Sequence, residues 1–244
     1  MKILLVNDDG YKAEGINVLE RVLREYGHEI YLNAPSSQMS GKSHSMTFHF
    51  PLKVHRLAPN RFATDGTPVD CVLYSKRLGL FDPEPDLVIS GINEGYNVAC
   101  DIVYSGTCGG AREGALSGMK SIAISCEGKN YEEAARFLCD RLDEIYPIRD
   151  DTCFLNLNVP PNFNGQMKFT IPGDVRYCDD INITDDDGET MTMIVGDVHK
   201  IDGHREGIIN DIEACKEGYA SASVISIYSF VNEEKQKALE GALN

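Results

Sequence analysis

The chain has 244 residues and a mass of 27.0 kDa, with 42% hydrophobic and 25% charged residues, which suits one large globular domain or one domain with an extension. Its 23 Lys and Arg residues against 38 Asp and Glu residues give a net charge of −15. This excess argues against a surface for nucleic acid or anionic lipid, because both need clustered cations. It does not exclude an acidic pocket that concentrates metal ions for a phosphorylated substrate.

Targeting signals are missing from the sequence. No apolar stretch approaches the roughly 20 residues of a membrane span, and the apolar run at residues 3–6 is too short for a signal-peptide core. No two of the eight cysteines are three residues apart, so there is no CxxC zinc or redox motif. We therefore expect reduced thiols, no membrane contact and a cytoplasmic location.

The first two thirds of the chain alternate segments typical of strands and of helices. This alternation predicts an α/β fold, in which a mostly parallel sheet has helices on both faces. In chain order, the pattern predicts strands at residues 3–6, 28–32, 85–90, 121–125 and 153–159, and helices at residues 16–23, 111–119 and 131–145.

Local signals set the ends of two helices. Gly27 is expected to end the first helix, since glycine adopts the left-handed conformation of a helix C-terminus. Thr67 as N-cap and Pro68 in the first turn predict the start of another helix.

Past residue 160 the pattern changes. Residues 190–195 alternate and predict a strand, preceded by an acidic turn at residues 185–188. Residues 174–189 hold seven acidic residues and one basic residue, which we interpret as a solvated hairpin. Residues 233–243 predict a short amphipathic helix.

An acidic pair follows the first predicted strand directly, in the sequence Asn7-Asp8-Asp9-Gly10. In an open α/β sheet, ligands bind beyond the carboxyl ends of the strands. Two adjacent carboxylates repel each other unless a cation lies beside them, and oxygen ligands suit Mg²⁺ or Mn²⁺. The same residues also suit a turn and a helix N-cap, so the motif alone leaves both interpretations open.

Two further loops combine glycines with hydrogen-bonding side chains. Residues 90–97 offer bare backbone together with the amides of Asn93 and Asn97. Residues 104–110 place hydroxyls and backbone amides where a helix is expected to begin, which is an arrangement that binds anions. An ordinary turn or cap explains either loop alone, whereas the three loops together suggest a metal-dependent phosphate site.

The segment Gly41-Lys42-Ser43 resembles the end of a phosphate-binding P-loop, but Ser36 stands where the first glycine should be. Residues 46–50 that follow predict a strand, whereas a P-loop leads into a helix. We therefore reject a P-loop here.

Five sequence blocks are familiar in combination: MKILLVNDDG at residues 1–10, Ala34-Pro35 followed by Ser40-Gly41, GTPVDC at 66–71, SGIN-x-G-x-N at 90–97 and YSGT at 104–107. In this order and spacing they resemble the SurE family of stationary-phase survival proteins, over residues 1 to about 125. The resemblance implies a Rossmann-like catalytic core, which we expect at residues 1–165. Residues 166–244 would form a hairpin, strand and helix extension that exchanges between subunits to give dimers or tetramers and is not an independent domain.

The resemblance also implies the site. The family's metal ligands fall on Asp8, Asp9, Ser40 and Asn93, which would hold one Mg²⁺ or Mn²⁺ per subunit. Asp8 and Asp9 are also the catalytic candidates, one of them as general base.

The family's phosphate-contacting groups fall on Asn97, Ser105, Gly106 and Thr107. Cys108 departs from the family, which commonly has Val and small residues after YSGT, and a thiol there could make activity sensitive to thiol reagents.

The expected function is metal-dependent hydrolysis of nucleoside 5′- and 3′-monophosphates to nucleoside and phosphate, as in an acid-phosphatase-type 5′-nucleotidase. Two alternatives stay open at this point. One is a metal phosphatase for a sugar phosphate or short polyphosphate, and the other is a non-catalytic module that binds nucleotide or metal.

Overall fold

The computed structural model describes residues 1–148, 152–186, 189–200, 207–229 and 236–237. Its strands are β1 (Lys2–Val6), β2 (Glu29–Pro35), β3 (Val54–Ala58), β4 (Arg61–Thr64), β5 (Leu87–Glu94), β6 (Lys120–Cys126), β7 (Cys153–Val159), β8 (Met167–Phe169), β9 (Val175–Asp186), β10 (Glu189–Lys200) and β11 (Ala220–Ser226). Its helices are α1 (Glu14–Glu25), α2 (Pro68–Arg77), α3 (Asp101–Tyr104), α4 (Gly106–Leu116), α5 (Tyr131–Ile145) and α6 (Asp211–Lys216), with a 3₁₀ turn at Tyr146–Ile148.

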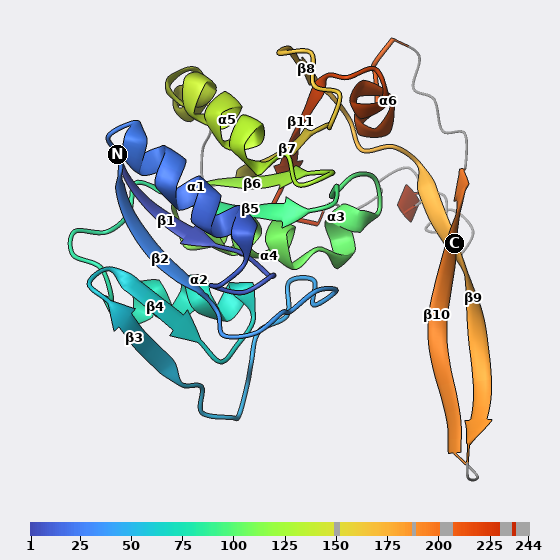
Figure 1. Ribbon diagram of the computed structural model, residues 1–244, viewed down its shortest axis with the longest axis horizontal. Coiled ribbons are helices and arrows are strands. Elements are labelled where there is room, and N and C mark those ends of the chain that lie inside the picture. Colours follow the sequence, from blue (N-terminus) through green and yellow to red (C-terminus); the bar gives the residue numbers. More distant parts are fainter. Residues whose placement is uncertain (149–151, 187–188, 201–206, 230–235, 238–244) are drawn as a thin grey trace.

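A nine-stranded sheet in the order β3-β4-β2-β1-β5-β6-β7-β11-β8 forms the centre of the molecule. The six strands from β4 to β7 in this order run parallel, β3 and β11 run antiparallel to their neighbours β4 and β7, and β8 is parallel to β11. Helices α1 and α5 cover one face, and α2 and α4 cover the other (Figure 1). The predicted α/β fold with a mostly parallel sheet is confirmed.

The alternation of side chains along β1 shows why this strand is apolar throughout. Ile3 and Leu5 belong to the core under α1 and α5, whereas Leu4 and Val6 belong to the core on the side of α2. A parallel strand with helices on both faces has no side that water can reach, so every position favours an apolar residue.

Several predicted element ends are confirmed. Strand β7 and helix α5 have the predicted bounds. Thr67 and Asp70 form a reciprocal capping box at the start of α2, and Gly27 has a φ of +83° just after α1.

The strand predicted at residues 46–50 is wrong. The backbone N–H of Thr47 donates to the Asp70 carboxylate at 2.9 Å, so this segment is held by a side chain of α2 instead of by a neighbouring strand.

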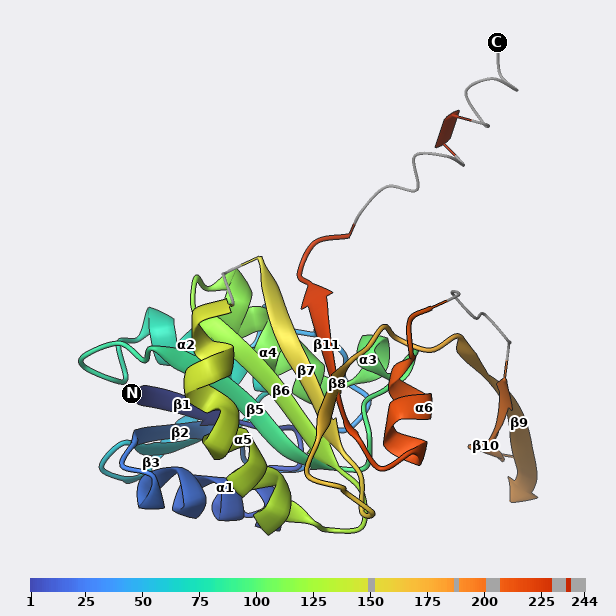
Figure 2. The same cartoon turned by 90° about the horizontal axis from the view of Figure 1, so that it is seen from above.

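The hairpin predicted in the acidic region is present. Strands β9 and β10 pair antiparallel from Val175 opposite Lys200 to Asp186 opposite Glu189, and the hairpin extends away from the large sheet (Figures 1 and 2). Apart from residues 236–237, the helix expected at 233–243 lies outside the described residues.

The part of the chain after residue 165, expected to form an extension, contributes strands β8 and β11 to the large sheet. Strand β11 comes from near the end of the chain and pairs along the whole outer edge of β7, and β8 then pairs with β11 (Figure 2). Part of the expected extension is therefore integral to the sheet, because β11 satisfies backbone groups that β7 would otherwise expose.

Candidate active site

A cleft of about 420 Å³ opens at the carboxyl ends of β1, β2 and β5. The chain runs from β1 outward to β2 on one side and returns to β5 on the other, so this cleft lies where the strand order reverses, a frequent ligand site in α/β sheets. We call it the acidic cleft. Six of the eight predicted site residues line it: Asp8, Asp9, Ser40, Asn93, Asn97 and Ser105.

Asp8 lies at the bottom of the cleft with only 4% of its surface exposed. Burial raises the pKa of its carboxyl group, while hydrogen bonds from the Thr107 hydroxyl and from the backbone N–H groups of Thr107 and Gly106 act in the opposite direction. A Cβ atom on Gly106 would lie 2.9 Å from the Asp8 carboxylate, so only glycine allows this approach. The first turn of α4 therefore holds Asp8 in place.

Asp9 is half-buried beside Asp8. Burial is the main cause that raises the pKa of Asp9 to about 6, the negative charges of Asp8 and Glu94 add to it, and the backbone N–H of Glu94 lowers it. Two carboxyl groups whose pKa values are both raised gain stability from any cation that binds between them.

Asn93 reaches the cleft through an irregularity in β5. The register of β5 against β6 shifts between Ser90 and Asn93, and a Cβ atom on Gly91 would lie 2.2 Å from the Ile124 carbonyl oxygen. The Asn93 side-chain amide donates to the Gly95 carbonyl oxygen at 2.9 Å, which leaves its own carbonyl oxygen for a ligand.

Ser40 comes to the cleft on the loop after β2, and this loop is fastened to α4 and the end of α3. The Ser43 backbone N–H donates to the Tyr104 carbonyl oxygen at 2.9 Å. A Cβ atom on Gly109 would lie 2.4 Å from the Ser43 carbonyl oxygen, so the loop packs on a bare part of α4. His44 pairs with the buried Glu113 at 3.1 Å and completes the attachment.

Asn97 is positioned by β6 and β7. Its backbone N–H donates to the Asn158 side chain at 2.8 Å, and its carbonyl oxygen accepts from Asn156 at 2.7 Å. Its side-chain amide donates to the Ser125 hydroxyl at 2.8 Å. The second hydrogen of this amide is available to a ligand.

Ser105 and Thr107, which are both predicted to bind phosphate, have different surroundings. Ser105 lines the cleft and caps α4 by accepting from the Cys108 backbone N–H at 3.0 Å, so its hydroxyl hydrogen can be donated to a ligand. The Thr107 side chain is fully buried and turned toward Asp8. Thr107 is therefore placed to orient a carboxylate, which the sequence did not indicate.

The cleft also contains residues that the sequence analysis did not propose as site residues: Gln38, Gly41, Glu94, Tyr96, Asp101 and Tyr104. Glu94 and Tyr96 lie inside the loop of residues 90–97, so their neighbours could have indicated them. Gln38 donates to the Ser40 hydroxyl at 3.1 Å, and nothing in its sequence context indicated that contact.

The donor set fits a hard divalent cation. Two carboxylates, the Asn93 amide oxygen and the Ser40 hydroxyl offer only oxygen atoms, as Mg²⁺ and Mn²⁺ prefer. Within the described residues no group of three or more His, Cys, Asp and Glu side chains converges on one point, so a cation here would need the neutral oxygens as well.

Cys108 is shielded from the cleft. Its thiol is completely buried, and burial raises its pKa to about 12. The sensitivity to thiol reagents that its position suggested is not supported, because a buried neutral thiol reacts poorly.

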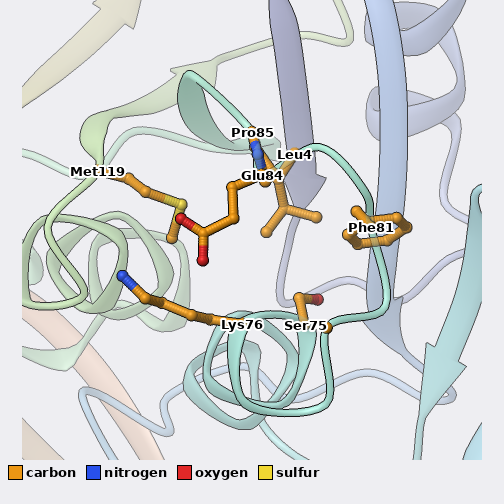
Figure 3. A pocket seen from close by; sticks show the side chains of 8 residues that line it. Leu4, Ser75, Lys76, Phe81, Glu84, Pro85 and Met119 are labelled. Carbon is orange, nitrogen blue, oxygen red and sulfur yellow. The ribbon is translucent and has the colours of Figure 1, made fainter.

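A smaller hollow lies at the opposite ends of the strands, between the side chains of Leu4, Phe81 and Met119, with Lys76 and Glu84 at its side (Figure 3). Its volume of about 20 Å³ accommodates little more than one water molecule, so it is not a substrate site. None of the helices in the described ranges combines the length and the apolar character needed to cross a bilayer.

Comparison with known proteins identifies the family to which the chain belongs. The family model described as "Survival protein SurE" matches residues 3–179. The protein named 5′-nucleotidase SurE in Fervidobacterium nodosum is 40% identical, with 99% of this chain and 96% of that protein covered, and its namesake in Thermosipho melanesiensis is 38% identical, with 98% and 96% covered. The crystal structure of the SurE protein from Aquifex aeolicus covers 100% of both chains with a TM-score of 0.82 and 33% identity. The chain belongs to the SurE family.

Proposed function

We propose that the acidic cleft hydrolyses nucleoside monophosphates to nucleoside and phosphate, with a divalent cation held by Asp8, Asp9, Ser40 and Asn93. The observation that carries this proposal is the pair of adjacent carboxylates, Asp8 and Asp9, whose pKa values are both raised at the carboxyl end of β1. The relatives named 5′-nucleotidase SurE, which match nearly the whole chain, support the reaction class.

When bound, Mg²⁺ or Mn²⁺ would neutralise the two carboxylates and polarise an oxygen of the phosphoryl group. The other groups then have separate tasks. Ser105 and the Asn97 amide donate hydrogen bonds to the remaining phosphoryl oxygens, where negative charge is spread in the transition state. Thr107 and Gly106 keep the Asp8 carboxylate in one orientation.

Asp9 is the better candidate for the general base. It is only half-buried, whereas Asp8 is almost completely buried, so its carboxylate is the more accessible of the two to a water molecule in the cleft. Asp8 is fixed by three donors from α4, so it is placed to act as a ligand.

The test is phosphate release from AMP, GMP and their 3′ isomers in Mg²⁺, in Mn²⁺ and in EDTA, for the wild type and Asp8→Asn. We expect EDTA to abolish turnover. Asp8→Asn should lower kcat/KM more than the roughly 10- to 100-fold that loss of a supporting contact costs a metal site. Asp143→Asn, an exposed carboxylate on α5, is the matched control. Turnover in EDTA, or full activity of Asp8→Asn, would contradict the proposal.

We also propose that the C-terminal part of the chain joins subunits into a dimer or tetramer. Four large apolar side chains of this part are exposed: Phe169, Ile208, Val224 and Tyr228. Such a group on a single chain is typical of an interaction surface. Light scattering of the full chain and of a chain ending after Tyr228 should show whether assembly depends on the final residues.

A cytoplasmic location is part of the same proposal. The described cysteines at 71, 100, 108, 126, 139 and 215 are free thiols, which persist in a reducing compartment. Fractionation of cells that express the protein tests this location.

A further inference from the structure

A second hollow adjoins the acidic cleft and has the opposite character. It has a volume of about 320 Å³, and its apolar lining residues are Val98, Pro161, Ile212 and Cys215. Tyr96 belongs to the lining of both hollows, so they adjoin at this residue. We call this second hollow the apolar pocket.

The polar groups of the apolar pocket lie at its rim. Glu127, Asn162 and Lys216 are exposed, whereas the thiol of Cys215 is buried. Tyr96 hydrogen-bonds to the Glu127 side chain, which fixes the ring between the two hollows. An apolar interior with polar groups at the edge suits a flat heterocycle, whose faces are apolar and whose edge carries donors and acceptors.

The wall contributed by α6 is firmly tied to the loop that carries Asn97. The Asp211 carboxylate is completely buried and accepts from the backbone N–H groups of Ala99 at 2.8 Å and Gly173 at 2.9 Å. Asn210 caps α6 by accepting from the Glu213 backbone N–H at 2.9 Å. The pocket is therefore a fixed part of the fold, next to the residues that line the cleft.

We infer that the apolar pocket binds the nucleobase of the substrate while the acidic cleft binds its phosphate, with the sugar passing Tyr96. This inference rests on the proposed function for the identity of the substrate. The volume of the pocket is at the lower end of the roughly 300–1,000 Å³ typical of ligand sites, and it is large enough for one nucleobase. Both hollows are needed to hold a molecule with one anionic end and one aromatic end.

The test compares AMP with ribose 5-phosphate, which has the sugar and the phosphate but no base. Ile212→Trp fills the pocket from α6, on a segment far along the chain from every proposed metal ligand. We expect KM for AMP to rise about 10-fold or more, and kcat and KM for ribose 5-phosphate to stay within about twofold. Leu78→Trp is the control, since Leu78 is exposed at the end of α2 and lines neither the acidic cleft nor the apolar pocket.

Binding of adenosine supplies a readout that needs neither phosphate nor catalysis. Calorimetry in EDTA should detect adenosine binding to the wild type and to Leu78→Trp, with at least a 10-fold weaker affinity for Ile212→Trp. If Ile212→Trp changes neither adenosine binding nor KM for AMP, the inference is overturned, although cation-dependent hydrolysis of AMP would still support the proposed function. If adenosine binds as expected but no nucleotide is hydrolysed, the proposed function fails and the pocket assignment stands.

One rival position for the base is testable in the same assay. Tyr104 lines the mouth of the acidic cleft from α3 and is 60% exposed, so its ring could also stack on a base. If Tyr104→Ala raises KM for AMP and Ile212→Trp does not, the base lies on α3 and the inference is wrong.

Discussion

The acidic cleft and the apolar pocket share one aromatic ring and differ in almost everything else. The cleft is built from loops after β1, β2 and β5, and its lining carries carboxylates, amides and hydroxyls. The pocket needs β6, β7 and the late helix α6, and its interior is apolar. The groups that would bind the phosphate of any phosphomonoester thus lie apart from the groups that would bind a particular nucleobase. Mutations should therefore change the rate of phosphate hydrolysis and the preference for a nucleobase independently.

The largest effect is expected for the support of Asp8. Thr107→Val removes the hydroxyl that donates to the carboxylate and keeps the shape of the side chain. We expect cation affinity and kcat/KM to fall roughly 10- to 100-fold, because a ligand without its supporting hydrogen bond loses its orientation. The loss should be equal for AMP and ribose 5-phosphate, as measured by initial rates over a range of Mn²⁺ concentrations.

Thr107→Ser is the control, since it restores the hydroxyl and should recover most of the affinity. A loss confined to AMP in Thr107→Val would show that the cleft and the pocket are not separate.

An intermediate effect is expected for the connection between the pocket and the sheet. Asp211→Asn replaces one carboxylate oxygen with an amide NH2 group, which cannot accept from the Ala99 or Gly173 backbone N–H. One buried donor is left unpaired, and the free energy of unfolding should fall by about 1–3 kcal/mol. Urea unfolding measures this change, and KM for AMP should rise more than KM for ribose 5-phosphate.

Glu217→Gln is the comparison for Asp211→Asn, because Glu217 is exposed just after α6 and forms a surface ion pair with Lys168. Its effect on unfolding should stay within about 0.5 kcal/mol. Equal effects of the two variants would mean that Asp211 does not anchor α6.

The smallest effect is expected from thiol chemistry. Cys108 lies behind the acidic cleft and Cys215 in the wall of the apolar pocket, and burial raises the pKa of each thiol to about 12. At pH 7.5 or below, both stay protonated and shielded. Iodoacetamide should leave the activity of the native protein unchanged, and mass spectrometry should find both residues unmodified until denaturant is added. Modification of Cys215 alone in the native state would show that its thiol is accessible from the apolar pocket.

The periodic segments were the part of the fold that could be predicted from sequence. Strand β7 and helix α5 were predicted with their observed bounds, because a continuous apolar run and a helical repeat each fit one structure. Strands β3 and β4 were not predicted, since β3 is almost entirely exposed and has no apolar face. Strand β11 reads ASASVIS, whose small residues carry little pattern, and α6 has only six residues.

The site residues also differ in whether the sequence could indicate them. Asp8 and Asp9 could be predicted because they follow a recognisable strand, whereas Ser40 was indicated only by family resemblance. The contact between Thr107 and Asp8 depends on how α4 packs against β1, which no local pattern encodes. The apolar pocket could not be predicted either, because its walls come from segments that are distant in the sequence.

The position of β11 between β7 and β8 has a consequence for biosynthesis. Chains leave the ribosome N-terminus first, so β7 is made and paired with β6 well before residues 220–226 exist. Until then its outer edge presents unpaired backbone groups, which are a template for aggregation. A stalled or prematurely terminated chain would carry every proposed metal ligand and still leave the edge of β7 uncovered. Synthesis of β11 thus removes an edge that would otherwise favour aggregation.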